Sequence, residues 1–266
     1  MKIKEIEAKS IITKSNLPDA DFVINPYVGC SHACVYCYAD FMKRFTGHSD
    51  EEWGEFVDVK VNADELIDVS KIKVGSKIVI GSVCDPYQAC ETKYEITRKC
   101  LEKLKDFGGR VDIITKSPLV LRDIELLKEF KDLRVCVSIG ILDKNAASKL
   151  EPGAALPKER IETLRKLHEA GIYTILFVSP IFPKISDIEK LVDLTKDYVD
   201  EFWFENLNIR ANNRKKIFEF LGKSYLKFVE FYSGLSKDYW EKVRDNIIKK
   251  CKWEGLKYHI YFFHGK

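Results

Sequence analysis

The 266-residue sequence lacks any apolar run that approaches the roughly 18 residues required to cross a membrane. Residues 1–10 are charged and lack the apolar stretch of a secretory signal, so we expect a cytoplasmic protein without a membrane partner. An excess of one charge is also missing, since 44 lysines and arginines are balanced by 41 aspartates and glutamates. The net charge of +3 therefore neither indicates nor excludes nucleic-acid binding.

The sequence also lacks a fixed-period repeat, a low-complexity tract and an obvious linker. What recurs is a short, β-branched apolar stretch, then a loop, then a helical pattern, which is typical of a parallel sheet buried on both faces. Expected strands occupy residues 22–24, 77–85, 110–117, 134–141, 172–180, 201–208 and 256–263. The pattern predicts an α/β fold, a partial (β/α)6-type parallel barrel with a C-terminal extension of helices and a strand.

Expected helices lie between these strands, at residues 92–109, 156–171, 186–194 and 236–251. The third is expected to begin with a capping box formed by Ser186 and Glu189. We place a core at residues 1–210 and a helical extension that packs on it at residues 211–266. In such barrels the chemistry lies at the carboxyl ends of the strands. Polar residues occur there in this chain, namely Asp85, Lys116, Ser138, Ser179, Glu205 and Asn206.

Three of the eight cysteines lie within residues 30–37, spaced C-x3-C-x2-C, and no fourth cysteine stands beside them. A structural zinc site usually needs two such pairs, and the second pair is missing, since Cys84 and Cys90 are six positions apart. Thiolates also bind iron–sulfur clusters. Three thiolates on a four-iron cluster leave one iron for another ligand, such as an amino acid that chelates it.

The C-x3-C-x2-C spacing, with Tyr36 before the last cysteine, resembles the signature of the radical S-adenosylmethionine (radical SAM) superfamily. Three further motifs, DPYQACE at 85–91, ITKSPLVLRDIELL at 114–127 and SIGILDKNAASKLEPGAALPKER at 138–160, make the chain similar to its spore photoproduct lyase-like branch. The resemblance implies a 4Fe–4S cluster that reductively cleaves S-adenosylmethionine to a 5′-deoxyadenosyl radical, which abstracts hydrogen from a substrate. It also implies an electron donor of the flavodoxin or ferredoxin type.

The same resemblance assigns residues to roles. Cys30, Cys34 and Cys37 would bind the cluster, and the backbone of Tyr36 would lie against the adenine of S-adenosylmethionine. The cofactor's other contacts would be Lys116 at its carboxylate, Ser82 and Asp85 at its amino group, and Ser138 nearby. Simpler interpretations remain open for two of them: Lys116 would reach solvent, and Ser138 would bond the backbone.

The chain departs from the branch at two cysteines. Authentic spore photoproduct lyases carry a hydrogen-donor cysteine in the second strand, where the matching position of this chain is Ser82, with Cys84 two positions later. Because strand side chains two apart share a face, we expect Cys84 to point into the same cavity, as a catalytic hydrogen-atom donor or as core packing. Cys90 replaces a proline that is usual in the branch.

The substrate stays open. The expected activity is that of a lyase or oxidoreductase acting on a nucleic acid or nucleotide, and the alternatives are modification of a peptide or protein, or a non-catalytic iron–sulfur or zinc protein. Residues 205–214, rich in asparagine and arginine, suit phosphate or base edges, or a polar turn before a helix. Tyr232, Trp240 and Tyr258 fit core packing or a substrate wall. The sequence does not indicate an oligomeric state.

Overall fold

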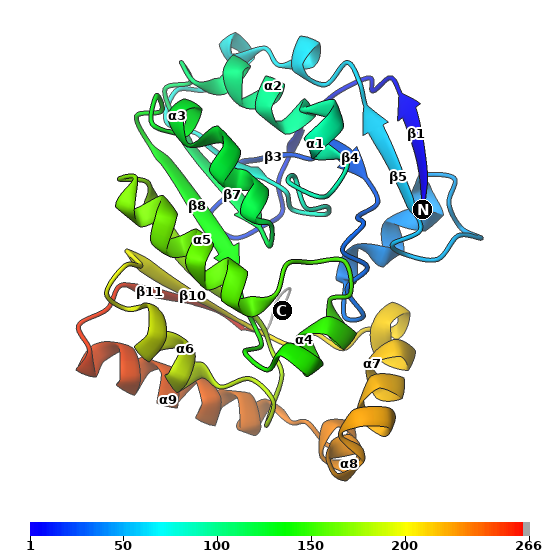
Figure 1. Cartoon of the computed structure of the whole chain (residues 1–266), viewed down its shortest axis with the longest axis vertical. Coiled ribbons are helices and arrows are strands. Elements are labelled where there is room, and N and C mark those ends of the chain that lie inside the picture. The colour runs from blue at the N-terminus through cyan, green and yellow to red at the C-terminus, as the bar shows by residue number, and fades with distance from the viewer. Residues whose placement is uncertain (263–266) are drawn as a thin grey trace.

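Seven parallel strands and one antiparallel edge strand form the central sheet of the computed structural model, which describes residues 1–262 (Figure 1). The strand order is β11-β10-β9-β8-β7-β6-β3-β2, and β2 is the antiparallel strand. Its strands are β2 (Ile12–Lys14), β3 (Phe22–Ile24), β6 (Lys77–Ile80), β7 (Arg110–Thr115), β8 (Leu133–Ser138), β9 (Tyr173–Ile181), β10 (Glu201–Asn206) and β11 (Tyr258–Tyr261). No ladder within residues 1–262 joins β11 to β2, so the barrel is open, as the predicted partial barrel requires.

Helices connect the parallel strands. They are α1 (Glu91–Tyr94), α2 (Ile96–Leu104), α3 (Ile124–Leu127), α4 (Lys144–Leu150), α5 (Pro157–Glu169), α6 (Ile188–Thr195), α7 (Ala211–Ser224), α8 (Val229–Ser233) and α9 (Lys237–Trp253). α5 and α6 pack on the sheet, whereas α7 and α8 lie beyond its edge (Figure 1). Among the described residues, none of these helices combines the length and the apolar character that a membrane span needs.

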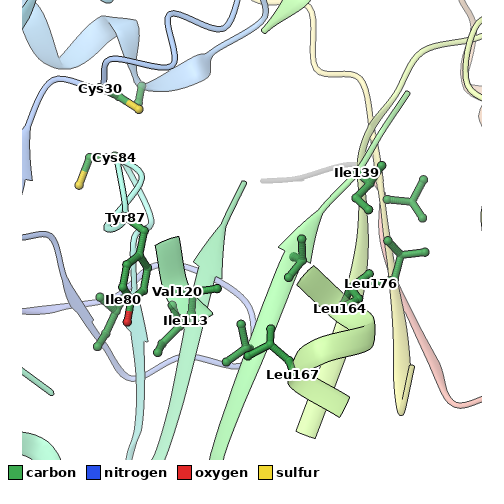
Figure 2. Packing of buried hydrophobic residues seen from close by; sticks show 14 of the residues in the cluster. Cys30, Ile80, Cys84, Tyr87, Ile113, Val120, Ile139, Leu164, Leu167 and Leu176 are labelled. Carbon is green, nitrogen blue, oxygen red and sulfur yellow. The ribbon is translucent and has the colours of Figure 1, made fainter. Parts of the chain in front are cut away.

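The core lies between the sheet and these helices. Every residue of β8 is buried, as expected for a central strand of a parallel sheet covered on both faces. Figure 2 shows Ile80 and Ile113 extending from neighbouring strands, with Leu164 and Leu167 of α5 on the same side of the cluster. All four side chains are fully buried, so truncating any one to alanine should cost about 2–5 kcal/mol.

A second, smaller sheet was not predicted. It has the order β1-β5-β4 and consists of β1 (Lys2–Ile6), β4 (Tyr27–Val28) and β5 (Phe56–Lys60). β1 is mostly exposed and charged, and β4 has two residues, so neither produces a clear alternating pattern. This sheet matters for function because β4 leads directly into the cysteine loop.

Two local predictions were wrong. The helix expected over 92–109 is broken at Glu95, whose left-handed φ of 52° ends α1 before α2 begins. The Ser186–Glu189 capping box does not form. Ser186 Oγ instead bonds the backbone of Phe182 and Gly140, and α6 is capped one residue later by Asp187, which accepts from Lys190 N.

The C-terminal segment joins the core in two ways. β11 extends the sheet beside β10, and α7 packs on the 3-10 helix η1 (Tyr38–Phe45) that follows the cysteine loop. The division at residue 210 stays a prediction. Phe263, the last residue of the predicted final strand, lies outside the described residues.

Candidate active site

A cavity of about 490 Å³ opens at the carboxyl ends of the strands. All nine predicted site residues line it, although they come from four separate segments of the chain: Cys30, Cys34, Tyr36, Cys37, Ser82, Cys84, Asp85, Lys116 and Ser138. Figure 2 shows Cys84 on the loop beyond Ile80, with Cys30 across from it on the neighbouring loop. The parallel topology explains this convergence, because it brings the ends of all these strands to one edge.

The cysteine loop is a set of tight turns held from outside. Ala33 adopts a left-handed φ of 52°, and Cys37 N donates to Cys34 O at 3.0 Å. Gln88, the only glutamine of the chain and fully buried, accepts from Ser31 N at 2.8 Å and donates to Gly29 O at 3.3 Å. Gln88 thus fixes the backbone of the cysteine loop. This role was not predicted from the sequence, although the motif that contains Gln88 was identified.

The three thiols of this loop are shielded from water. Burial raises the pKa of Cys34 to about 12 and also raises the pKa values of Cys30 and Cys37. Without a bound cation they are therefore neutral thiols. Across residues 1–262, no three His, Cys, Asp or Glu side chains converge as ligands of a single metal ion.

Two asparagines at the start of α7 hold the other side of the loop. Asn213 Nδ2 donates to Tyr36 O at 2.9 Å, and Asn212 Nδ2 donates to Tyr38 O at 3.3 Å. Asn213 is 1% exposed and also accepts from Arg210 N, which caps α7. The polar turn predicted at 205–214 therefore caps its helix and fastens the cysteine loop at once.

A buried ion pair between Glu151 and Arg160 holds the Tyr36 side chain in place. Arg160 Nη2 donates to Glu151 Oε2 at 2.6 Å, and the two residues are 1% and 3% exposed. The Tyr36 hydroxyl donates to the other oxygen of Glu151. Arg160 also donates to the carbonyls of Ala155 and Ser138, so one guanidinium links the cysteine loop, α5 and the end of β8.

Asp85 holds the backbone from which the Lys116 side chain projects. Asp85 accepts from Thr115 Oγ1 and from Lys116 N, both at 2.7 Å, and so ties the end of β7 to the loop after β6. Lys116 Nζ lies 5.9 Å from the centre of the Tyr36 ring, and no carboxylate within residues 1–262 forms an ion pair with it. Burial lowers the pKa of Lys116, but Cys34 and Glu151 raise it by more, so the side chain carries its charge.

Ser82 and Cys84 reach the cavity by a different route from the one predicted. β6 ends at Ile80, and Gly81 turns the chain with a φ of +91°, so the expected strand through Asp85 does not form. A Cβ on Gly81 would lie 2.5 Å from Pro86 Cδ, which explains the glycine. Asn25 then fixes the loop by donating to Ser82 Oγ and accepting from Val83 N, both at 3.0 Å.

Cys84 is 6% exposed and lies 3.8 Å from Asn25 Oδ1. Burial raises the pKa of Cys84 to about 12, so it holds a hydrogen atom on sulfur at neutral pH. Ser138, 2% exposed, donates to Ser179 O at 3.0 Å, which confirms a backbone hydrogen bond for that hydroxyl while it still faces the cavity.

Aromatic rings form the opposite wall. Phe177, Trp203 and Tyr261 project from adjacent strands and meet edge to face, with ring centres 5.4–6.5 Å apart. Trp203 Nε1 donates to Glu201 Oε1 at 2.5 Å, which fixes its ring. The core packing predicted for Tyr232 and Trp240 is confirmed, whereas the alternative of a substrate wall is wrong, since neither these two nor Tyr258 lines the cavity within the described chain.

The site fits an iron–sulfur cluster with an anionic co-ligand. Three thiols face one cavity without the convergence that a single ion would need, and Lys116, which is half-buried, forms no ion pair with a protein carboxylate among residues 1–262. A partly desolvated ammonium is stabilised when an anion joins it. The carboxylate of a bound amino-acid ligand would supply that anion.

Comparison with known proteins agrees with this site. The radical SAM superfamily model matches residues 24–195. An uncharacterized protein of Methanocaldococcus jannaschii is 36% identical over 94% of this chain and 95% of its own. The radical SAM Nalpha-GlyT isomerase of Pseudomonas phage M6 is 26% identical over 60% of this chain and 33% of its own. A spore photoproduct lyase complexed with dinucleoside spore photoproduct shares the fold, with a TM-score of 0.74 and 16% identity over 98% of this chain and 82% of that chain.

Proposed function

The chain belongs to the radical SAM superfamily, and from that premise we propose that it abstracts a hydrogen atom from a nucleobase-containing substrate held in the cavity. The family uses a 4Fe–4S cluster and S-adenosylmethionine, which together supply a carbon-centred radical by one-electron cleavage of the cofactor. In our proposal Cys30, Cys34 and Cys37 would hold the cluster, and the cavity beside them would hold S-adenosylmethionine.

The remaining predicted residues bind and orient the cofactor. Lys116 would pair with its carboxylate, because this side chain lines the cavity and no carboxylate among residues 1–262 forms an ion pair with it. Asp85 would act through Lys116, since its carboxylate already accepts from the Lys116 amide. Ser138 and Ser82 would offer hydroxyl oxygens as acceptors to the cofactor, and Tyr36 would present its backbone to the adenine.

The observation that carries the substrate class is the aromatic wall of Phe177, Trp203 and Tyr261. Planar bases stack on such rings for about 1–3 kcal/mol per base. Asn208 and Arg210 line the same cavity and offer donors suited to base edges or phosphate. The spore photoproduct lyase that shares this fold is complexed with a dinucleoside spore photoproduct, which supports a nucleobase-containing substrate.

Cys84 would return a hydrogen atom to the substrate. In that step the S–H bond of Cys84 breaks as a C–H bond forms on the substrate carbon, and the unpaired electron passes to the Cys84 sulfur. One electron from the electron donor and one proton from solvent would then restore the thiol. The buried, protonated thiol at the cavity edge supports this role.

The test uses anaerobically reconstituted protein with S-adenosylmethionine and dithionite, and measures 5′-deoxyadenosine. Deuterated nucleosides, short oligonucleotides and peptides are then compared for deuterium transfer into that product. Transfer from a nucleoside or oligonucleotide is the expected result, whereas transfer from peptides alone would refute the substrate class. If substrate increases the rate of 5′-deoxyadenosine formation, Trp203→Leu should abolish that increase. Trp253→Leu, which changes a ring 88% exposed on α9, should leave the increase unchanged.

The role of Cys84 has its own readout. Cys84→Ala should leave deuterium transfer into 5′-deoxyadenosine intact but change the final product, because the substrate radical would lose its hydrogen source. An unchanged product would show that Cys84 only packs.

A further inference from the structure

Two helices cover the outside of the cysteine loop. η1 begins at Tyr38, directly after Cys37, and α7 packs against it (Figure 1). Asn212, in the first turn of α7, donates to the carbonyls of Cys37 and Tyr38. Any molecule resting on the surface of η1 and α7 would therefore lie close to the proposed cluster without entering the cavity.

This surface, which we call the η1–α7 face, is basic. Its two helices carry two acidic residues, Asp40 and Glu219, and six basic ones: Lys43, Arg44, Arg214, Lys215, Lys216 and Lys223. The whole chain, by contrast, is nearly balanced at 44 basic to 41 acidic residues. The positive charge is thus a property of η1 and α7 themselves, and the adjacent segment contributes Glu52, which pairs with Lys216.

Much of that charge is available to a partner. Arg44, Arg214, Lys215 and Lys223 are exposed, and the side chain of Lys215 is 87% exposed, 4.0 Å from Glu219. Lys43 and Lys216 are less accessible, because they pair with Asp40 and Glu52. Next to Arg44, the Phe45 ring is 75% exposed, which places an apolar anchor within the basic surface.

None of these basic side chains lines the cavity in the described chain, where η1 contributes Tyr38 and Ala39 and α7 contributes nothing. The face is therefore separate from the place where substrate would bind. It is suited to a partner that must come near the cluster but must not fill the cavity.

We propose that the η1–α7 face docks an acidic electron-carrier protein with a flavin or iron–sulfur centre, which passes one electron to the cluster. The carrier is oxidised by one electron, the cluster is reduced by one, and no bond forms between the proteins. This inference rests on the proposed function, since it needs a cluster in the cysteine loop. Opposite charges at such a face chiefly raise the rate of encounter, and they do so less at high salt.

The test compares two double variants with equal changes of net charge. Arg44→Glu with Lys215→Glu reverses the η1–α7 face. Lys242→Glu with Lys249→Glu reverses two exposed lysines of α9, which covers the sheet away from the cysteine loop. For each protein, 5′-deoxyadenosine formation is measured with dithionite and, separately, with a reduced flavodoxin over a range of concentrations and salt.

The face variant should need roughly tenfold more flavodoxin for half-maximal rate at low salt. The difference in flavodoxin requirement between this variant and wild type should become smaller at high salt. With dithionite as reductant, the two proteins should form 5′-deoxyadenosine at the same rate. The α9 variant should behave as wild type with both reductants. An unchanged flavodoxin requirement in the face variant would overturn the proposal.

Other outcomes point elsewhere and also decide the matter. An equal loss with dithionite would show that these residues support the cluster or the substrate. A selective loss of affinity for a single-stranded oligonucleotide would make the face a nucleic-acid surface instead. If wild type made no 5′-deoxyadenosine with dithionite, the proposed function itself would fail, and the docking inference with it.

Discussion

Replacing Glu151 with alanine should destabilise the protein by about 3–5 kcal/mol, the usual cost of removing one partner of a buried ion pair. The cost arises at Arg160, 1% exposed, which would keep its charge but lose the carboxylate 2.6 Å away. The Tyr36 hydroxyl would lose its acceptor as well. At about 2 °C per kcal/mol for a chain of this size, the thermal midpoint should fall by roughly 6–10 °C.

Urea unfolding of anaerobically reconstituted protein with matched iron content would measure this change. Glu151→Gln is the control, because its amide keeps one acceptor for Arg160 and should lose less stability. Glu151→Leu combined with Arg160→Met should be more stable than Glu151→Ala, since no charge is then left buried. A Glu151→Ala loss below 1 kcal/mol, or a double variant no more stable than Glu151→Ala, would refute the reasoning.

Three further outcomes are expected. Lys116→Met should weaken S-adenosylmethionine binding by about 10–100-fold in equilibrium dialysis, because a charge-assisted hydrogen bond is worth roughly 1.5–3 kcal/mol; unchanged binding would remove Lys116 from the site. Asn213→Asp, which keeps the acceptor for α7 but cannot donate to the loop, should lower iron retained per chain while α7 stays folded by circular dichroism. Burial lowers the pKa of His48, but hydrogen bonds with Asp58 and Glu51 raise it by more. The stability advantage of wild type over His48→Gln should therefore be full below the unfolded pKa of about 6.5 and vanish as pH rises through the folded value, measured by urea unfolding from pH 5.5 to 8.5.

The sequence predicted the features that depend on composition and spacing. Continuous apolar strands between amphipathic helices indicate a buried parallel sheet, and β3 and β6–β11 confirm it. Once the sheet is parallel, polar residues at strand ends must meet at one edge, which is why the nine predicted site residues line one cavity.

The predictions that were wrong concern local backbone geometry, which depends on tertiary contacts. The strand assigned through Asp85 stops at Ile80 because Gly81 turns under Pro86, and no apolar pattern reveals that contact. The aromatic wall of Phe177, Trp203 and Tyr261 was not predicted, because period-2 patterns give the two faces of a strand but not which face turns inward. The core packing predicted for Tyr232 and Trp240 is confirmed.

The clamp, by which we mean the hydrogen bonds from Asn212 and Asn213 to the cysteine loop, was not predicted for a related reason. It depends on contact between distant parts of the chain. Asparagine-rich turns are common before helices, so the pattern at 205–214 did not identify a partner. Only the packing of α7 on η1 shows that these amides serve the cysteine loop.

That clamp has a consequence for biosynthesis. Cys37 and Asn212 are 175 positions apart, so most of the polypeptide is translated after the cysteines leave the ribosome and before their fastening appears. During that interval the loop lacks two of the amide contacts that shape it. Iron and sulfide should therefore be captured stably only by nearly completed chains, and a nascent chain halted before residue 211 should release them.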